Sequence, residues 1–168
     1  MDFGLLVARS VFVIAMSAHG AQKLFGWFGG YGISGTGQFF ESIGFRPGRV
    51  LAVAAGFGEV AGGLLVALGL LGPVGPALML SVMIVASNLH WKNGLFATAN
   101  GIELPLLYSA AAVALAFTGY GTYSLDAFFG LARVWTPDLI WTVVALGVLG
   151  GVGNLVVRNV STHAAVGA

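Results

Sequence analysis

Residues 50–91 read VLAVAAGFGEVAGGLLVALGLLGPVGPALMLSVMIVASNLHW, which is two apolar runs separated by a short Gly-Pro turn. The runs, about 50–71 and 73–91, are each close to the roughly 20 residues that a helix needs to cross about 30 Å of hydrocarbon. The connection at 72–76 is so short that the two helices must be antiparallel neighbours. Proline is tolerated there because it falls in the first turn of the second helix. The stretch therefore predicts a transmembrane helical hairpin.

Three further apolar segments, about 3–28, 102–118 and 138–157, lie on either side of this hairpin. The chain is 58% hydrophobic and 8% charged, with a mean hydropathy of +0.94. Soluble domains devote about a quarter of their residues to charged side chains. Backbone polar groups in lipid must be satisfied internally, and no alternating barrel strands are visible, so the segments should be helices. We predict an all-α transmembrane bundle in one membrane domain over residues 1–168, a multi-pass protein of the cell membrane.

Small residues and the longer connections add detail to this bundle. Gly58 and Gly62 form a small-xxx-small pair, and Gly147 and Gly151 form another. Such pairs let helices approach closely. Packing within the chain is favoured over a dimer interface, although a homo-oligomer stays open. The connections 29–49 and 119–137 predict short interfacial helices, the second capped by Ser124.

Composition also excludes several classes of function. The chain has no cysteine, which removes disulfides, thiolate metal sites and c-type haem attachment, and we expect no metal site. A net charge of +1 without a basic tract gives no argument for nucleic acid as a partner. The first apolar run is interrupted by Arg9, continues to Phe28 and lacks a convincing cleavage site before His19, so we expect a membrane span and not a signal peptide.

Four ionisable residues, Arg9, His19, Lys23 and Glu59, fall within predicted spans. Such residues cost about 2.5–3.5 kcal/mol each on insertion scales and usually face the bundle interior. At about 100° per residue, Arg9 and His19 each lie within about 40° of Lys23 around the first helix, so the three share one side of it. His19 lies about 13 Å from the end of the first helix and Glu59 about 13 Å from the start of the second, and these helix ends are at the same side of the membrane, so the two residues can meet. Arg9 falls near the opposite surface, where its stem can snorkel.

A second polar group collects at the end of the bundle nearest Lys23. His90, Asn93, Asn100 and Glu103 flank the loop between the third and fourth segments. The polar residues therefore describe a funnel that ends near His19 and Glu59. Two interpretations are open: a Lys23–Glu59 ion pair that locks two helices together, with His19 beside it, or a functional pocket. The pocket is favoured because a locking pair needs neither two histidines nor polar groups at the mouth.

The order of these motifs resembles that of a known family. The run at 18–26, Ala-His-Gly-Ala-Gln-Lys-Leu-Phe-Gly, is similar to the His-Gly-x-x-Lys-Leu-Phe-Gly opening of DoxX-like membrane proteins. Phe39-Phe40, Gly44-Phe45 and Glu59 in GEVAGGLL follow, then the segments HWKNG at 90–94, NGIELPL at 100–106 and SLD at 124–126. The resemblance covers about 5–130 and implies a four-helix core. The segment at about 138–157 is then an additional C-terminal helix.

The resemblance also implies a class of function. Some DoxX-like proteins are similar to a subunit of thiosulfate:quinone oxidoreductase, and others are linked to membrane-associated oxidoreductase complexes. We therefore expect a subunit that binds a quinone or a similar amphiphile. In its pocket His19, Lys23 and Glu59 would be catalytic, and Arg9 with the four mouth residues would bind ligand. His19 would donate to a carbonyl and shuttle protons, Glu59 would orient it, and Lys23 would stabilise negative charge. A soluble or membrane redox partner must supply electrons, because no flavin fingerprint or cysteine is present.

Other functions compete with this one. Distant relatives of the family act as chaperone-like membrane proteins, so a non-catalytic scaffold that anchors redox enzymes is the main alternative. A b-type cytochrome with His19 and His90 as axial ligands is disfavoured, because the two residues differ in depth. A transporter is disfavoured because no internal repeat is visible.

The positive charges suggest an orientation in the membrane. Arg46, Arg49, Lys92 and Arg158 lie at one face, against Arg133 at the other. The positive-inside rule then puts the N-terminus outside, and the C-terminus and the funnel mouth in the cytoplasm. A reporter fused at the C-terminus tests this orientation.

Overall fold

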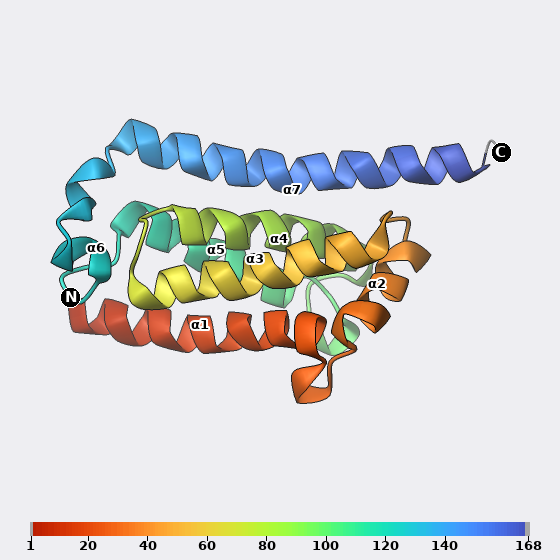
Figure 1. Ribbon diagram of the computed structural model, residues 1–168, viewed down its shortest axis with the longest axis horizontal. Helices are drawn as coiled ribbons and strands as arrows, with labels where there is room; N and C mark the ends of the chain where they lie inside the picture. Colours follow the sequence, from red (N-terminus) through yellow and green to blue (C-terminus); the bar gives the residue numbers. More distant parts are fainter. Residues whose placement is uncertain (1, 167–168) are drawn as a thin grey trace.

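Five long helices run side by side in the computed structural model, which describes residues 2–166 and the side chains of residues 2–158 (Figure 1). They are α1 (Asp2–Phe25), α3 (Gly48–Leu68), α4 (Val74–His90), α5 (Glu103–Thr118) and α7 (Pro137–Val166). Short elements lie at the two ends of the bundle: η1 (Trp27–Gly29), α2 (Gly32–Ser42), η2 (Trp91–Asn93) and η3 (Ala97–Ala99) at one, α6 (Leu125–Phe128) and η4 (Leu131–Val134) at the other. The predicted all-α transmembrane bundle is confirmed.

Four helices of the described chain are long and apolar enough to cross a membrane. They are α1, α3, α7 and the helix formed by α4 with η2. The remaining helix, α5, is apolar but has 16 residues, which gives a length of about 24 Å. It nevertheless connects loops at opposite ends of the bundle (Figure 1). A short helix of this kind is accommodated where the bilayer thins or where flanking side chains reach the interface.

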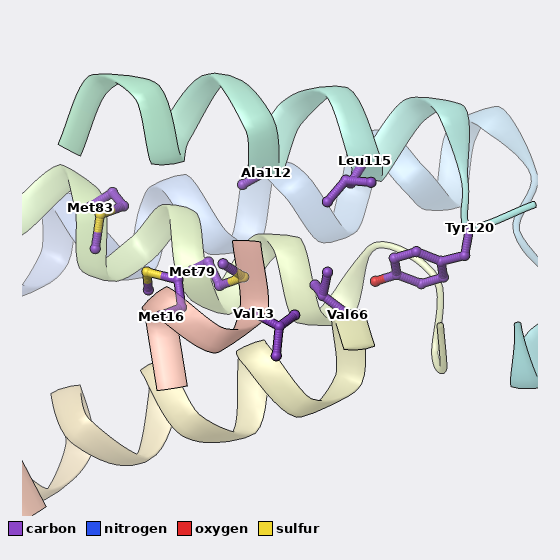
Figure 2. Close-up of a cluster of buried hydrophobic side chains, with 8 residues drawn as sticks. All are labelled: Val13, Met16, Val66, Met79, Met83, Ala112, Leu115 and Tyr120. Atoms are coloured by element: carbon purple, nitrogen blue, oxygen red, sulfur yellow. The ribbon is translucent and has the colours of Figure 1, made fainter. Parts of the chain in front are cut away.

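The main core lies between α1, α3, α4 and α5 (Figure 2). Its buried members are Val13, Met16, Val66, Met79, Met83, Ala112, Leu115 and Tyr120. No described residue of α7 belongs to this cluster, because α7 lies outside the four helices and packs along α4. The structure therefore shows a four-helix core with a fifth, peripheral helix at the C-terminal end, which is the arrangement that the sequence predicted.

Both glycine pairs serve packing within the chain. A Cβ at Gly62 would lie 3.1 Å from the Gly75 carbonyl oxygen of α4. A Cβ at Gly147 would lie 2.6 Å from the carbonyl oxygen of Ala77, on the same helix. Two helix backbones can approach this closely only where the residue carries a hydrogen atom in place of a side chain. In lipid the hydrophobic effect does not hold helices together, so their association depends on such close packing.

Gly147→Ala should therefore destabilise the contact between α4 and α7. The added methyl group would overlap the Ala77 carbonyl, and overpacking of this kind costs about 1–3 kcal/mol. The matched control is Gly153→Ala on the same helix, where a Cβ would meet nothing within 4 Å. The control should be neutral or stabilising because alanine is the better helix former. Thermal unfolding in detergent measures both, and equal melting temperatures would contradict the close packing.

The short helix α6 is held against the turn between α3 and α4. Ser124 caps it, because the Ser124 hydroxyl oxygen accepts a hydrogen bond of 3.2 Å from the Ala127 backbone N–H, as predicted. The Asp126 backbone N–H donates to the Gly69 carbonyl oxygen at 2.9 Å. This segment thereby covers the end of the bundle where α3 ends.

Asp126 fastens the same turn with its side chain. Its carboxylate accepts from the backbone N–H groups of Leu71 (2.9 Å) and Gly72 (2.6 Å) and from Trp135 Nε1 (3.0 Å). The Tyr120 hydroxyl donates to the Gly72 carbonyl oxygen at 2.7 Å. Burial raises the pKa of the Tyr120 phenol, and the nearby Asp126 carboxylate raises it further, so the hydroxyl remains a donor. The backbone N–H and carbonyl groups of the turn thus have hydrogen-bond partners in side chains about 50 residues later in the chain.

Candidate functional site

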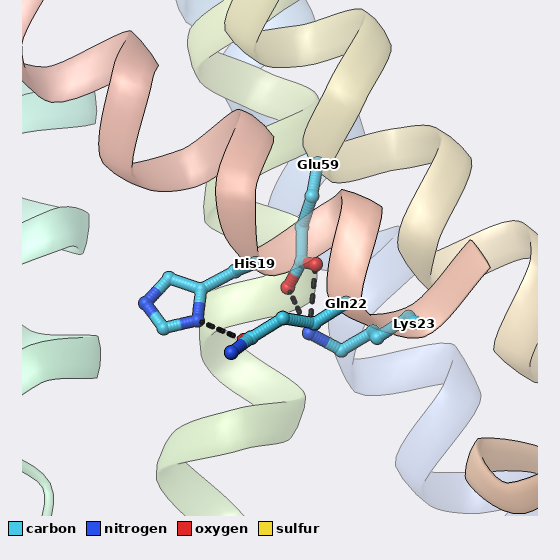
Figure 3. A network of polar contacts seen from close by, with 4 residues as sticks. All are labelled: His19, Gln22, Lys23 and Glu59. Atoms are coloured by element: carbon cyan, nitrogen blue, oxygen red, sulfur yellow. Dashed lines mark hydrogen bonds and ion pairs between the residues drawn. The ribbon is translucent and has the colours of Figure 1, made fainter. Parts of the chain in front are cut away.

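An ion pair joins α1 to α3 inside the bundle. Lys23 Nζ lies 2.8 Å from Glu59 Oε1 and 2.7 Å from Oε2 (Figure 3). The Glu59 side chain is 3% exposed and the Lys23 side chain 25%. This ion pair was one of the two interpretations that the sequence allowed, the other being a functional pocket. Since a carboxylate in such surroundings needs a charged partner to stay ionised, Lys23 holds the negative charge of Glu59 in place.

Two glycines bring the helices close enough for this pair. A Cβ at Gly20 would lie 2.8 Å from the Gly56 carbonyl oxygen, and one at Gly56 would lie 2.7 Å from Leu24 Cγ. Gly20 follows His19 directly, and Gly56 lies one turn before Glu59. The small residues of the two motifs therefore set the distance over which Lys23 reaches the carboxylate.

His19 lies beside the ion pair but points elsewhere. Its Nδ1 donates to Gln22 Oε1 at 3.1 Å, because an amide oxygen only accepts, and the Gln22 amide donates to the Phe28 carbonyl oxygen at 3.1 Å. The ring meets Tyr108 of α5 edge-on, with the centroids 6.1 Å apart. Among the described residues no hydrogen bond joins His19 to Glu59, and Figure 3 shows the imidazole turned away from the carboxylate. The direct contact that the depth estimate allowed does not form.

A cavity of about 280 Å³ lies on the other side of the ion pair, between α1, α2, α3, α4 and α7. This volume is near the lower end of the range for small-molecule sites. The polar residues that line it are Lys23, Glu59, Ser81, His90 and Asn154. The apolar lining consists of Phe39, Phe40, Phe45, Leu51, Ala54, Ala55, Gly58, Leu78, Val82, Val85, Ala86 and Leu89. A long apolar wall with a few polar groups is suited to an amphiphile.

The four predicted mouth residues mainly organise their own loop. His90 Nδ1 (2.8 Å) and Asn93 Nδ2 (3.1 Å) both donate to the Asn100 carbonyl oxygen. The Glu103 carboxylate accepts from the Ala97 backbone N–H at 2.8 Å. Of the four, His90 is the one that also lines the cavity. The loop thus fixes the His90 ring with Nδ1 protonated, which leaves Nε2 as a proton acceptor.

Arg9 lies at the opposite end of the bundle and does not line the cavity. The depth estimate from the sequence also placed Arg9 at this end. The prediction that its side chain extends to the membrane surface is wrong, because Arg9 is 2% exposed. Its guanidinium donates to the Tyr123 carbonyl oxygen and lies 5.8 Å from the centroid of the Tyr120 ring. The segment after α5 folds over the helix end and encloses the side chain, so Arg9 acts in packing at that end.

Sequence reasoning missed two residues of the cavity, Ser81 of α4 and Asn154 of α7. The search for site residues weighed ionisable side chains in spans, and neutral polar side chains were not weighed. The signal was present, since both positions are polar within otherwise apolar segments. Hydrogen-bonding side chains inside a membrane also require partners, and they can therefore mark a site.

The family to which this chain is similar comes from one comparison. The comparison with curated proteins found no match. The comparison with solved structures found none either. The family model described as DoxX matches residues 4–91, which is slightly more than half of the 168 residues. This match includes the paired Lys23 and Glu59 and most of the cavity lining. The chain therefore belongs to the DoxX family.

Proposed function

We propose that this protein is a membrane subunit of an oxidoreductase system and binds a quinone, or a similar amphiphile, in the cavity beside Lys23 and Glu59. The observation that carries the proposal is the placement of a charged donor and a charged acceptor at one edge of a largely apolar cavity. A quinone needs an apolar slot for its tail and polar groups at its carbonyl oxygens. The positive charges favour an orientation in the membrane in which this edge of the cavity is directed toward the cytoplasm.

The polar residues have separate roles in this proposal. The Lys23 ammonium donates to a ring oxygen and stabilises negative charge that develops on it. Glu59 holds Lys23 in place and accepts from a ring hydroxyl. His90 lines the cavity next to the loop at 91–102 and offers Nε2 for proton exchange with water. His19 does not line the cavity, so we assign it the positioning of Gln22 near the end of α1 and a packing contact with Tyr108 of α5. A partner protein supplies the electrons.

Mass spectrometry of the organic extract tests the proposal. The protein is purified in a mild detergent, and the amount of quinone bound per chain is compared among variants. Ala55 lines the cavity, so Ala55→Phe should fill it and abolish co-purification. Glu59→Gln should lower the bound amount about tenfold, because a charge-assisted hydrogen bond is lost. Val53→Phe is the matched control, since Val53 lies on the same helix, is 42% exposed and does not line the cavity.

The control should retain the amount of quinone found with the unmodified chain. A protein that carries no enriched amphiphile in any form would contradict the proposal. A non-catalytic scaffold that anchors redox enzymes would then be the favoured function, and Lys23, Glu59 and His19 would serve in packing alone. Equal loss in Val53→Phe and Ala55→Phe would point to disturbed folding, so the elution profile of each variant on size exclusion is recorded alongside.

A further inference from the structure

The wall of the cavity opposite the ion pair carries two polar side chains, Ser81 and Asn154. Ser81 lies nine residues before the end of α4 at His90, and Glu59 lies eleven residues after the start of α3 at Gly48. These helix ends are at the same side of the bundle, so the two residues lie about 13 Å and about 16 Å inside it. The cavity therefore has polar groups on two facing walls at similar depth.

Both side chains have unused hydrogen-bonding capacity. Ser10, Ser109, Thr118 and Thr142 each donate to the carbonyl oxygen four residues earlier, at 2.7 or 2.8 Å. The Ser81 hydroxyl makes no such bond and has no partner among the described residues.

The Asn154 side-chain amide has a hydrogen-bond partner for its nitrogen and none for its oxygen among the described residues. Its Nδ2 donates to the Gly150 carbonyl oxygen at 2.9 Å, which leaves the acceptor Oδ1 without a partner in the described part of the chain. Both side chains are half-buried at the wall of the cavity. A donor and an acceptor without partners are costly in the apolar interior of a membrane, unless water or a ligand satisfies them.

Both side chains lie next to Gly150 of α7. The Ser81 hydroxyl oxygen lies 3.3 Å from the position that a Cβ at Gly150 would take. Asn154 lies one helical turn beyond Gly150, on the same face of α7. The glycine thus leaves room for the hydroxyl, and α7 adds the amide oxygen beside it. The family match ends at residue 91, so Asn154 is a contribution of the additional helix.

We propose that Ser81 and Asn154 form a second polar contact in the cavity, which selects a ring with oxygen atoms on two opposite edges. This inference rests on the proposed function and specifies its ligand. A quinone carbonyl accepts from the Ser81 hydroxyl, and a quinol hydroxyl donates to Asn154 Oδ1. Lys23 and Glu59 offer the same combination of donor and acceptor on the facing wall. The cavity thereby holds either oxidation state of the ring with a satisfied oxygen at each edge.

Binding of two probes in lipid nanodiscs tests this inference. Decylhydroquinone has two ring hydroxyl groups, and meta-decylphenol has the same ring and tail with one. The unmodified protein should bind the hydroquinone about tenfold more tightly than the phenol. Ser81→Ala and Asn154→Leu should each weaken hydroquinone binding about tenfold and leave phenol binding unchanged, because each removes a contact to the second hydroxyl alone: Ser81 donates to its oxygen, and Asn154 Oδ1 accepts its proton. The preference for the hydroquinone should then disappear.

Two controls accompany the variants. Ser109→Ala and Thr142→Val remove hydroxyl groups that bond their own helices and do not line the cavity, so both should retain the preference. Asn154→Ala replaces the leucine variant if that protein does not fold. Preference retained in Ser81→Ala and in the Asn154 variant would overturn the second contact and leave the proposed function standing. Failure of the unmodified protein to bind either probe would overturn both.

Discussion

Lys23→Met should lower the free energy of unfolding in detergent by about 3–5 kcal/mol, which is one of the two largest effects we expect from a single side chain. The substitution leaves the carboxylate of Glu59, whose side chain is 3% exposed, without its ammonium partner. Breaking a buried pair by removing one partner carries this cost because the remaining charge is uncompensated. Chemical or thermal unfolding followed by circular dichroism measures it.

Removal of Glu59 should destabilise the protein less than removal of Lys23. Glu59→Gln leaves Lys23, whose side chain is 25% exposed and can turn toward water, so its cost should be smaller, about 1–2 kcal/mol. The double variant should be more stable than Lys23→Met alone, since the buried charge is gone. A double-mutant cycle gives the coupling between the two residues. If all three variants unfolded at the same point, the pair would not be the electrostatic contact that we describe.

Asp126→Ala should destabilise the protein by about 3–5 kcal/mol. The variant leaves the backbone N–H groups of Leu71 and Gly72 and the Trp135 indole N–H without their common acceptor. Hydrogen bonds to a charged group contribute about 1.5–3 kcal/mol each, and their losses overlap when the donors share one acceptor. Asp138→Ala is the matched control, because Asp138 is exposed in the first turn of α7.

The melting temperature of the two aspartate variants gives the comparison. Asp138→Ala should change it by a small amount, as exposed substitutions usually do. Asp126→Asn should fall between the control and Asp126→Ala, because the amide retains one acceptor oxygen but has lost the charge. A melting temperature of Asp126→Ala equal to that of the control would show that α6 does not fasten the turn between α3 and α4.

Much of the architecture could be predicted from the sequence because its signals are local. The apolar runs gave the helices, and the turn at 72–76 made α3 and α4 neighbours. The glycine pairs identified positions of close packing, and Ser124 identified a cap. Each of these depends on residues a few positions apart, for which helix geometry and solvent preference are sufficient.

The site could be predicted in part, for a geometric reason. Helical periodicity gives the depth of a residue and the side of the helix on which it lies, and this placed His19, Lys23 and Glu59 close together. It does not give which neighbouring helix that side faces. His19 and Lys23 differ by about 40° around α1, yet one points to Tyr108 and the other to Glu59.

The sequence by itself determined that this chain is a bundle of membrane helices with ionisable side chains in its interior, because lipid leaves few alternatives for the backbone and for such side chains. The tertiary structure decided which groups share a cavity. It enclosed Arg9 beneath the segment after α5, tied Asn93, Asn100 and Glu103 into a loop, and brought Asn154 of α7 and Ser81 of α4 into the lining of one cavity. These contacts join residues from separate helices, and their positions depend on how each helix rotates and packs against its neighbours.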